Sequence, residues 1–281
     1  MQYISYVLFR LLSGLLRLLP RRLLAFCIYV TLRLSRYRLP VIAQNLHASF
    51  PDWSNQQVYD TTVLFYKNLA TVVVSQLHAA PQRSVKYHNM ELLHEQAKQH
   101  KAVILLGSHF GCWETLGKAI TPLLGDYNQF VAYKKLKNPY VNKYLLKRRS
   151  DTPAVPIEMN TVYKNILTAT KQPKSSIYYL IADQYPSSLQ NIVECDFLHQ
   201  TTRWVNGPEK LAKRLNTPVL FMDVQYDDRT TVVDLHPVYI PNGLGSTESV
   251  TETYAKLLQR QIMRSPHHWL WSHKRWKNLR K

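Results

Sequence analysis

The chain has 281 residues, of which 46% are hydrophobic and only 19% are charged. This composition suits a folded domain and excludes a disordered chain. Thirty-six lysines and arginines against 18 aspartates and glutamates give a formal net charge of +18, which favours a polyanionic partner: nucleic acid, an anionic membrane face or an acidic substrate. The three cysteines have no short spacing, which argues against a disulfide scaffold or a zinc site. No G-x-G-x-x-G or Walker sequence occurs, which argues against a nucleotide-binding loop.

The first 38 residues are predicted to form a membrane-anchoring helical segment. Residues 3–34 are rich in leucine and other apolar residues but interrupted by arginines, so no uncharged run approaches the roughly 18 residues of a membrane-spanning helix. On a helix, Arg10, Arg17 and Arg21 fall within about 40° of one another, with leucines on the other side. This pattern is typical of a basic amphipathic helix lying in a membrane interface, which Pro20 would end or kink.

Two alternatives apply to this segment. A secretory signal would carry its positive charge before the apolar run, whereas here the charge lies within and after it. An ordinary amphipathic helix of the protein core fits the same pattern and stays open. We expect an anchor over residues 1–38 and one larger domain over residues 39–281, with the bulk of the protein in the cytoplasm, where free thiols are usual.

The larger domain shows alternating helical and strand patterns. Short apolar runs bounded by turn residues predict buried strands, and 3.6-residue periodicity predicts helices. Helices are expected over 52–77, where either Asp52 or Ser54 can be the cap, and over 89–99, 114–120, 139–149, 162–170 and 209–215. Strands are expected over 102–106, 129–133, 177–182, 218–222 and 231–235. Alternation of this kind indicates an α/β fold with a mostly parallel sheet flanked by helices, whose chemistry lies in the loops after the strands.

The segment VILLGSHFGCWETLG places His109 and Glu114 five residues apart. Spacing alone is weak, because eleven histidines give roughly 0.7 chance matches, and His47 and Asp52 form a second one. Context separates the two pairs. His109 follows a buried strand and precedes a helix that begins near Glu114, whereas the other pair lies in a polar connection.

This strand-to-helix turn has a geometry suited to acyl transfer. Gly111 would let the chain fold back so that the Glu114 carboxylate meets the His109 imidazole and fixes its tautomer while His109 removes a proton from an attacking hydroxyl. Backbone N–H groups at the helix start would stabilise the oxyanion. A purely structural His–Glu hydrogen bond fits equally well. Cys112, between the two, is interpreted as a packing residue rather than as a nucleophile.

Several segments resemble the lipid A biosynthesis lauroyl/myristoyl acyltransferase family of Gram-negative bacteria. GSHFGCWE resembles its H-x-x-x-x-D/E signature, and Trp113 before the acid resembles the Asn-Trp-Glu variant of it, with Cys112 in place of Asn. Further blocks match in order along nearly the whole chain: YRLPVIAQNLHASFPD, AYKKLKNPYVNKYLLKRR, LIADQYP, FLHQTTRWVNGPEKLAKRLNTPVLF and the terminal WLWSHKRWK.

The resemblance implies a glycerophosphate-acyltransferase-like α/β fold at the cytoplasmic face of the bacterial inner membrane. It also implies transfer of a fatty acyl chain from acyl carrier protein to a hydroxyl of a lipid A precursor, without a metal or bound cofactor; acyl-CoA is an alternative donor. His109 and Glu114 match the family's catalytic pair.

The resemblance also implies further residues that bind substrate or organise the site: Arg149 or Arg148, Asp183, Gln184 and Lys134. Lys134 departs from the family's usual arginine, keeping the charge but losing the bidentate guanidinium. The plain alternatives are a solvated charge run at a helix end for Arg149 and a simple cap for Asp183.

Three rival functions remain open on the sequence. The nearest is the same architecture acting on another anionic lipid or an aminolipid. A different class is a basic nucleic-acid-binding protein that uses Trp269, Trp271 and Trp276 as a stacking surface; the same residues also suit an interfacial aromatic girdle, which we favour because of the amphipathic N-terminus. The third is a non-catalytic membrane-binding protein. Acyl-chain length, the acceptor position and the oligomeric state are not predicted.

Overall fold

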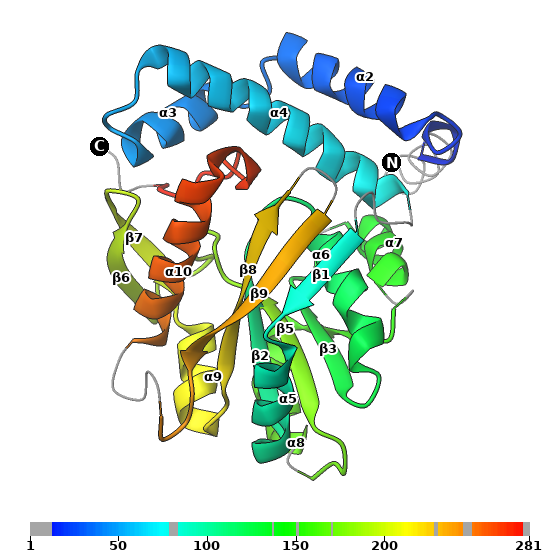
Figure 1. Cartoon of the computed structure of the whole chain (residues 1–281), viewed down its shortest axis with the longest axis vertical. Helices are drawn as coiled ribbons and strands as arrows, with labels where there is room; N and C mark the ends of the chain where they lie inside the picture. The colour runs from blue at the N-terminus through cyan, green and yellow to red at the C-terminus, as the bar shows by residue number, and fades with distance from the viewer. Residues whose placement is uncertain are drawn as a thin grey trace.

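The computed structural model describes residues 13–78, 84–136, 138–149, 152–169, 171–227, 230–243 and 249–277. Helices cover both faces of a seven-stranded sheet, and three further helices lie across one end of that sheet (Figure 1). The expectation of a mostly parallel sheet flanked by helices is therefore confirmed.

The described helices and strands alternate along most of the chain. The α-helices are α2 (Arg21–Leu34), α3 (Leu39–Ser49), α4 (Asn55–Leu77), α5 (Met90–Gln99), α6 (Trp113–Ile120), α7 (Pro139–Arg149), α8 (Val162–Ala169), α9 (Gly207–Leu215) and α10 (Val250–Arg264). The 3₁₀ helices are η1 (Thr121–Leu124), η2 (Met159–Thr161) and η3 (Pro266–His268). The strands are β1 (Ser84–His88), β2 (Ala102–Gly107), β3 (Asn128–Tyr133), β4 (Val155–Glu158), β5 (Ser176–Ile181), β6 (Ile192–Phe197), β7 (Gln200–Val205), β8 (Val219–Tyr226) and β9 (Thr230–Tyr239).

The large sheet has the strand order β1-β9-β8-β2-β5-β3-β4. Strands β8, β2, β5, β3 and β4 are parallel, whereas β9 returns antiparallel to β8 and pairs in parallel with β1. All six residues of β2 are buried, as expected for a central parallel strand covered on both faces. The parallel strands therefore deliver their carboxyl ends to one edge of the sheet.

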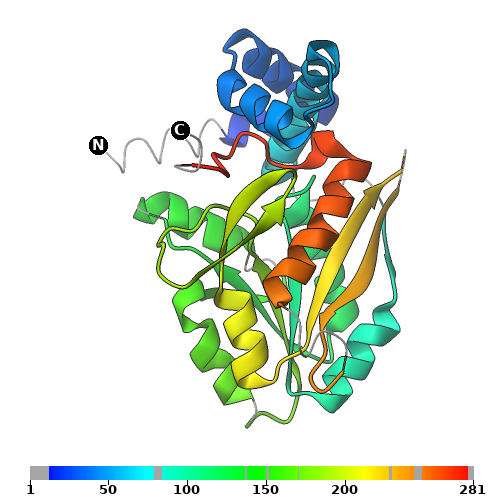
Figure 2. The ribbon, with the colours of Figure 1, turned by 90° about the vertical axis from the view of Figure 1, so that its left-hand side faces the viewer.

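The two faces of the sheet are covered by different helices. Because successive residues of a strand point to opposite faces of the sheet, Phe221 and Met222 of β8 identify the helices that cover each face. Phe221 contacts Tyr254 of α10 edge to face, and Met222 on the other side lines a cavity with Gly117 of α6. Figure 2 shows α10 beside the separate β6–β7 hairpin, whose two strands pair antiparallel.

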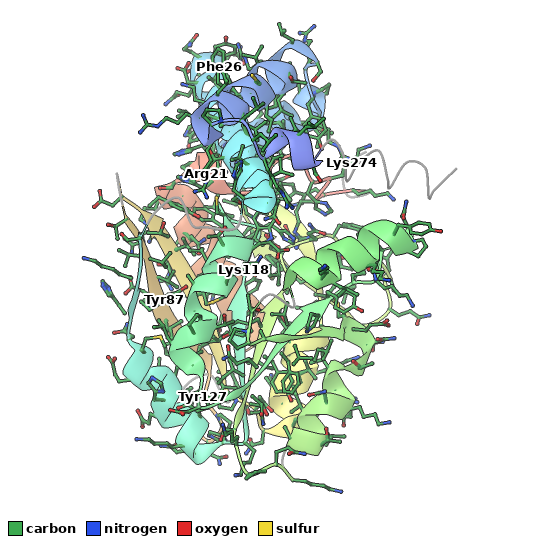
Figure 3. The ribbon with its side chains drawn as sticks, turned by 90° about the vertical axis from the view of Figure 1, so that its right-hand side faces the viewer. Arg21, Phe26, Tyr87, Lys118, Tyr127 and Lys274 are labelled. Atoms are coloured by element: carbon green, nitrogen blue, oxygen red, sulfur yellow. The ribbon has the colours of Figure 1, made fainter. Side chains whose placement is uncertain are left out.

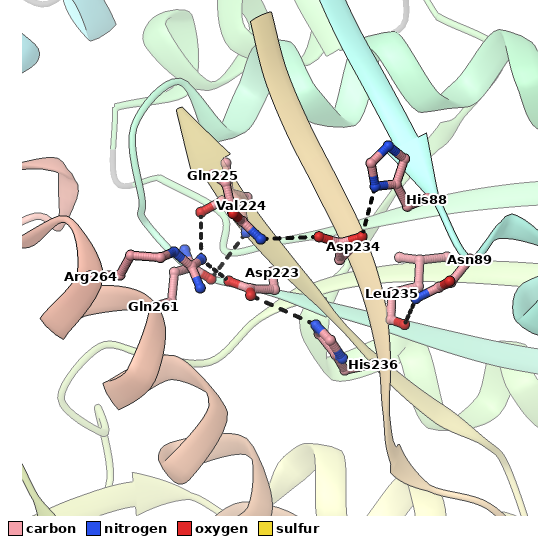
Figure 4. Close-up of polar contacts among 10 residues, drawn as sticks. All are labelled: His88, Asn89, Asp223, Val224, Gln225, Asp234, Leu235, His236, Gln261 and Arg264. Carbon is pink, nitrogen blue, oxygen red and sulfur yellow. Dashed lines mark hydrogen bonds and ion pairs between the residues drawn. The ribbon is translucent and has the colours of Figure 1, made fainter. Parts of the chain in front are cut away.

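Polar side chains tie the outer strands to α10 (Figure 4). Asp223 of β8 and Asp234 of β9 are directly opposed across the antiparallel pair, which is unfavourable for two carboxylates alone. Arg264 of α10 donates to Oδ1 of Asp223 at 2.7 Å, and Nε2 of His236 lies 3.7 Å from Oδ2 of the same residue. Nδ1 of His88 lies 3.1 Å from Oδ1 of Asp234. In this cluster, which we call the flank cluster, Arg264 compensates the charge of Asp223, and His88 and Gln225 are the polar partners of Asp234.

The helical layer formed by α2, α3 and α4 lies over the end of the sheet to which β8 points (Figure 1). Ser54 begins α4 as expected, with a capping box in which its hydroxyl accepts from the Gln57 N–H. Leu24 of α2 is buried, whereas Phe26 of the same helix stands on the outer surface of the layer (Figure 3).

The N-terminal helix expected from the sequence is not continuous through Arg21. Residues 13–16 are helical, a turn follows, and α2 begins directly after Pro20, so the break predicted at this proline is confirmed. Arg10 lies outside the described residues. Arg17 and Arg21 lie on either side of the proline, so the prediction that they share one helical face is wrong. None of the helices in the described part of the chain is long and apolar enough to span a bilayer.

Several elements were not predicted from the sequence. These are α3, β1, β4, the β6–β7 hairpin and α10. Strand β1 alternates exposed and half-buried residues, and β4 has four residues, so neither has the apolar run by which the other strands were identified. Helix α10 does carry a helical pattern, with Val250, Tyr254, Leu258 and Ile262 buried at four-residue spacing, and the expected elements did not include it.

The C-terminal tryptophans belong to the core. Trp269, Trp271 and Trp276 are 2%, 0% and 4% exposed. Trp276 donates its indole N–H to Thr202 Oγ1 at 2.7 Å, and Asn45 of α3 donates to the Trp271 carbonyl at 2.9 Å. Buried rings can neither stack on bases nor sit in a membrane interface, so both functions considered for these residues are wrong.

Candidate active site

The register of the two central strands brings His109 and Asp183 together. Strands β2 and β5 pair in parallel, with Gly107 opposite Ile181 at their carboxyl ends. His109 lies two residues after the end of β2, and Asp183 lies two residues after the end of β5. His109 and Asp183 therefore occupy equivalent positions on adjacent parallel strands, at the edge where α/β proteins place their binding sites.

Asp183 is the carboxylate that holds the imidazole. Its Oδ1 lies 2.6 Å from Nδ1 of His109, and its Oδ2 accepts the backbone N–H of His109 at 2.8 Å. The indole N–H of Trp269 donates to the same Oδ2 at 2.9 Å. Asp183 is 2% exposed, so both of its oxygens are satisfied inside the protein.

The contacts keep this buried carboxyl group ionised. Burial by itself raises the pKa of Asp183, but the charge of His109 and the hydrogen bonds from His109 and Trp269 outweigh it and hold the pKa below its ordinary value. An ionised partner at Nδ1 requires that nitrogen to carry a proton. The Nε2 lone pair of His109 is thereby directed away from Asp183, and Gln184 Nε2 lies 3.2 Å from it.

The loop that carries His109 is fixed on both sides. Phe110 is buried and bridges to Trp269 through the backbone. Gly111 has φ +53°, and a Cβ at this position would overlap the Tyr226 phenol ring. The Tyr226 hydroxyl accepts the backbone N–H of Cys112 at 2.9 Å. The chain therefore does turn at Gly111, with a left-handed backbone, but the turn packs against Tyr226, and the carboxylate at Nδ1 of His109 is that of Asp183.

His109 opens into a cavity of about 330 Å³, which we call the reaction cavity. Its wall includes Glu114 and Trp113 from α6, with Gln184 beside them, and the His109 and Trp113 rings meet edge to face at 5.0 Å. A second cavity of about 100 Å³ shares Trp113, Glu114, Ala132 and Ile181 with the first. Its remaining lining includes Val131, Leu180 and Met222, and the shared residues show that the two cavities adjoin between α6 and the sheet. We call the second the apolar cavity.

The other predicted site residues are placed as follows. Glu114 lies in the first turn of α6 on the wall of the reaction cavity, but the carboxylate at Nδ1 of His109 is that of Asp183, not Glu114 as expected. Lys134 lines the same cavity, with an exposed side chain. Arg148 and Arg149 end α7, and their side chains lie outside the described residues. Cys112 lines a separate cavity of about 210 Å³ behind the loop.

Sequence reasoning missed the roles of Trp269 and Tyr226. The terminal WLWSHKRWK segment is visible in the sequence, but its contact with a loop far earlier in the chain depends on the tertiary fold. The sequence predicts Asp183 as a loop-organising residue but does not identify its partner. Once β2 and β5 are taken as neighbours, the equal offset of His109 and Asp183 from their strand ends gives the pair directly.

The fold and the site define an α/β protein with a carboxylate-held histidine at the carboxyl ends of two parallel strands, facing a partly apolar cavity. The chain matches the family described as bacterial lipid A biosynthesis acyltransferase over residues 1–278. It therefore belongs to this family and is an acyltransferase of lipid A biosynthesis, a class that acts on a glycolipid acceptor. No curated protein matches the chain significantly.

Proposed function

We propose that this protein transfers a fatty acyl chain from the thioester of acyl carrier protein to a hydroxyl of a lipid A precursor, at the cytoplasmic face of the bacterial inner membrane. The observation that carries the proposal is the His109–Asp183 pair, with the reaction cavity on the other side of the imidazole. Membership of the acyltransferase family supports it.

His109 acts as the general base. Its Nε2 accepts the proton of the acceptor hydroxyl as the oxygen attacks the thioester carbonyl, and the C–S bond then breaks. The imidazolium that forms is stabilised by the ionised carboxylate of Asp183 at 2.6 Å. The proton finally passes to the leaving thiolate, which restores the neutral imidazole. No step draws on a metal or a bound cofactor.

Glu114 is the second acid of the proposed site. Since Asp183 contacts Nδ1 of His109, we assign Glu114 a different role: its carboxylate would orient the acceptor hydroxyl beside Nε2, which its position on the cavity wall supports. The developing oxyanion would be stabilised by the backbone N–H groups of Trp113 and Glu114, two lining residues of the reaction cavity at the start of α6.

The acyl chain and the charged groups bind on different sides of the cavity. The apolar cavity, with Val131, Leu180 and Met222 in its wall, suits the hydrocarbon chain, because apolar surface gains free energy on leaving water. Lys134 lines the reaction cavity. Arg148 and Arg149 follow another lining residue, Leu146, by two and three positions in α7. We propose that these cations bind the phosphates of the acceptor.

The helical layer supports the proposed membrane location. Ten of the eighteen large hydrophobic residues that are exposed in the described part of the chain lie within residues 13–78. They include Leu18 and Leu34, both 80% exposed. An apolar outer surface of this kind, over the end of the sheet that carries the site, is typical of proteins that rest in a membrane interface.

The test is mass spectrometry of acylated product made by purified protein from acyl carrier protein thioester and a lipid A precursor. We expect His109→Ala, folded by circular dichroism, to lose transfer, and His94→Ala, on the distant helix α5, to retain it. Transfer at the wild-type rate by His109→Ala would contradict the proposed base. A better rate with acyl-CoA, or with a different lipid acceptor, would replace the donor or the acceptor in the proposal.

A further inference from the structure

A cavity of about 430 Å³ lies within the helical layer and shares no lining residue with the reaction cavity. Arg33 near the end of α2 and Arg36 in the following turn line it, together with His47 of α3. Its other walls include Val58 and Tyr59 of α4. We call it the layer cavity. It combines two guanidinium groups with apolar walls.

Among the residues that the structure describes, the two arginines of the layer cavity have no carboxylate partner. Within the described residues, no carboxylate oxygen lies within 4.0 Å of either guanidinium group. Arg33 donates to the Tyr59 hydroxyl at 2.9 Å and stands over the same ring at 5.3 Å. The Tyr59 contact holds one guanidinium in place and leaves its charge uncompensated.

The residues around the layer cavity are both basic and apolar. Residues 13–78 carry seven lysines and arginines against two aspartates. Leu34 lies between Arg33 and Arg36 and is 80% exposed, and Tyr37, directly after Arg36, is 40% exposed. Nucleic acid would complement the charge but not the exposed leucine. A phospholipid complements both, because its phosphate lies beside its acyl chains.

We propose that the layer cavity binds the phosphate group of an anionic phospholipid of the bilayer, with Arg33 and Arg36 as its ligands and Leu34 inserted among the acyl chains. This inference rests on the proposed membrane location but not on the acyl-transfer chemistry. Guanidinium groups pair with phosphate oxygens through two parallel hydrogen bonds. The bound lipid fixes the height of the helical layer in the membrane, and with it the height of the reaction cavity.

The experiment measures sedimentation of the full-length protein with vesicles of phosphatidylcholine alone or of phosphatidylcholine mixed with phosphatidic acid. The test variant is Arg33→Gln/Arg36→Gln. The matched control is Arg21→Gln/Arg22→Gln, which removes the same charge from the first turn of α2, outside the cavity. Thermal melts show whether both variants are folded.

We expect both double variants to bind phosphatidic acid vesicles less tightly, because each basic residue near an anionic surface contributes. The cavity variant should lose about tenfold more affinity than the control, with little difference on phosphatidylcholine alone. Equal losses in the two variants would overturn the site, because general charge would then explain the binding. Saturable binding of inorganic phosphate without vesicle selectivity would overturn the lipid as its occupant.

Acyl transfer in detergent micelles separates this inference from the proposed function. The cavity variant should transfer acyl groups at the wild-type rate there, since it leaves His109 and Asp183 unchanged. If wild-type protein shows no transfer at all while the vesicle difference persists, the catalytic proposal fails and the lipid site stands. If transfer is normal and the vesicle difference is absent, the lipid site fails alone.

Discussion

In the part of the chain that the structure describes, histidine–aspartate contacts occur in two regions, and one of them has the features of a reaction site. In the flank cluster, His88 is more than half exposed, and Nδ1 lies 3.1 Å from Asp234 (Figure 4). In the active-site pair, Nδ1 of His109 lies 2.6 Å from Asp183, which is almost fully buried. The first pair lies across two strands on the outer part of the sheet, and the second lies just beyond the ends of two central strands.

The difference shows that proximity of an imidazole and a carboxylate does not define a site. The flank carboxylates have several partial partners, including an arginine, and serve to join β1, β9, β8 and α10. Asp183 instead has every contact directed at the His109 loop or at Trp269. Burial excludes competing water from the carboxylate, and His109 lines a cavity, where Gln184 lies beside its Nε2. These two conditions separate a reactive histidine from a structural one.

The largest expected effect comes from removing the charge of Asp183. Asp183→Asn cannot stabilise the imidazolium, and we expect acyl transfer to fall about a thousandfold. Asp234→Asn makes the same change in the flank cluster and should leave the rate within a factor of two or so of wild type. Single-turnover rates of the two folded variants check this. Similar losses in both would erase the distinction between the regions.

Gly111→Ala should disturb the active-site loop next most strongly. The new methyl group would meet the Tyr226 ring and require a positive φ that alanine rarely adopts. We expect a loss of about a hundredfold in rate, because a small displacement of His109 suffices for that. Gly125→Ala, where the Cβ would make only ordinary contact, serves as the control. A Gly111→Ala enzyme of normal rate would show that the loop tolerates movement.

Trp269→Phe should have a moderate and specific effect. It removes one hydrogen bond from Asp183 Oδ2 and keeps an aromatic ring in the core. We expect kcat to fall about tenfold with KM nearly unchanged, and the acidic limb of the pH–rate profile to move. Trp276→Phe removes an equally buried indole bond, to Thr202, and should lower stability without lowering kcat. Equal rates in the two variants would show that the Trp269 hydrogen bond to Asp183 does not contribute to catalysis.

The last expected effect concerns stability rather than rate, namely the pH dependence that His273 contributes near the C-terminal segment. Burial lowers the pKa of His273 to about 4, so between its ordinary value of 6.5 and about 4 the unfolded chain takes up a proton that the folded chain refuses. Stability from this residue should therefore fall as the pH drops through that window and level off below it. Melting curves of wild type and His273→Gln should converge toward pH 4 if this is correct. A constant difference would contradict it.

Much of the fold could be predicted from the sequence because the decisive signals are local. Continuous apolar runs identify β2 and β5, and Ser54 marks the start of α4 through its own capping contacts. The order of the strands in the sheet could not be predicted in this way. The neighbours β2 and β5 are separated in the chain by β3 and β4, and no residue pattern within either strand specifies that pairing.

The site was predicted in part for the same reason. His109 could be selected from its own strand-to-helix context, and Glu114 was assigned as its partner because it is near in sequence. The structure gives that place to Asp183, which is near only in space. Trp269 was assigned to a surface from its aromatic and basic neighbours, because sequence pattern does not distinguish a buried aromatic cluster from an interfacial one.

The most direct test of the central claim is a proton NMR measurement on histidine-labelled protein in its resting state. The account predicts a strongly deshielded Nδ1 proton for His109, arising from its short bond to a carboxylate. That resonance should disappear in Asp183→Asn and persist in Glu114→Gln. Its loss in Glu114→Gln with retention in Asp183→Asn would contradict the assignment of the carboxylate that holds the imidazole.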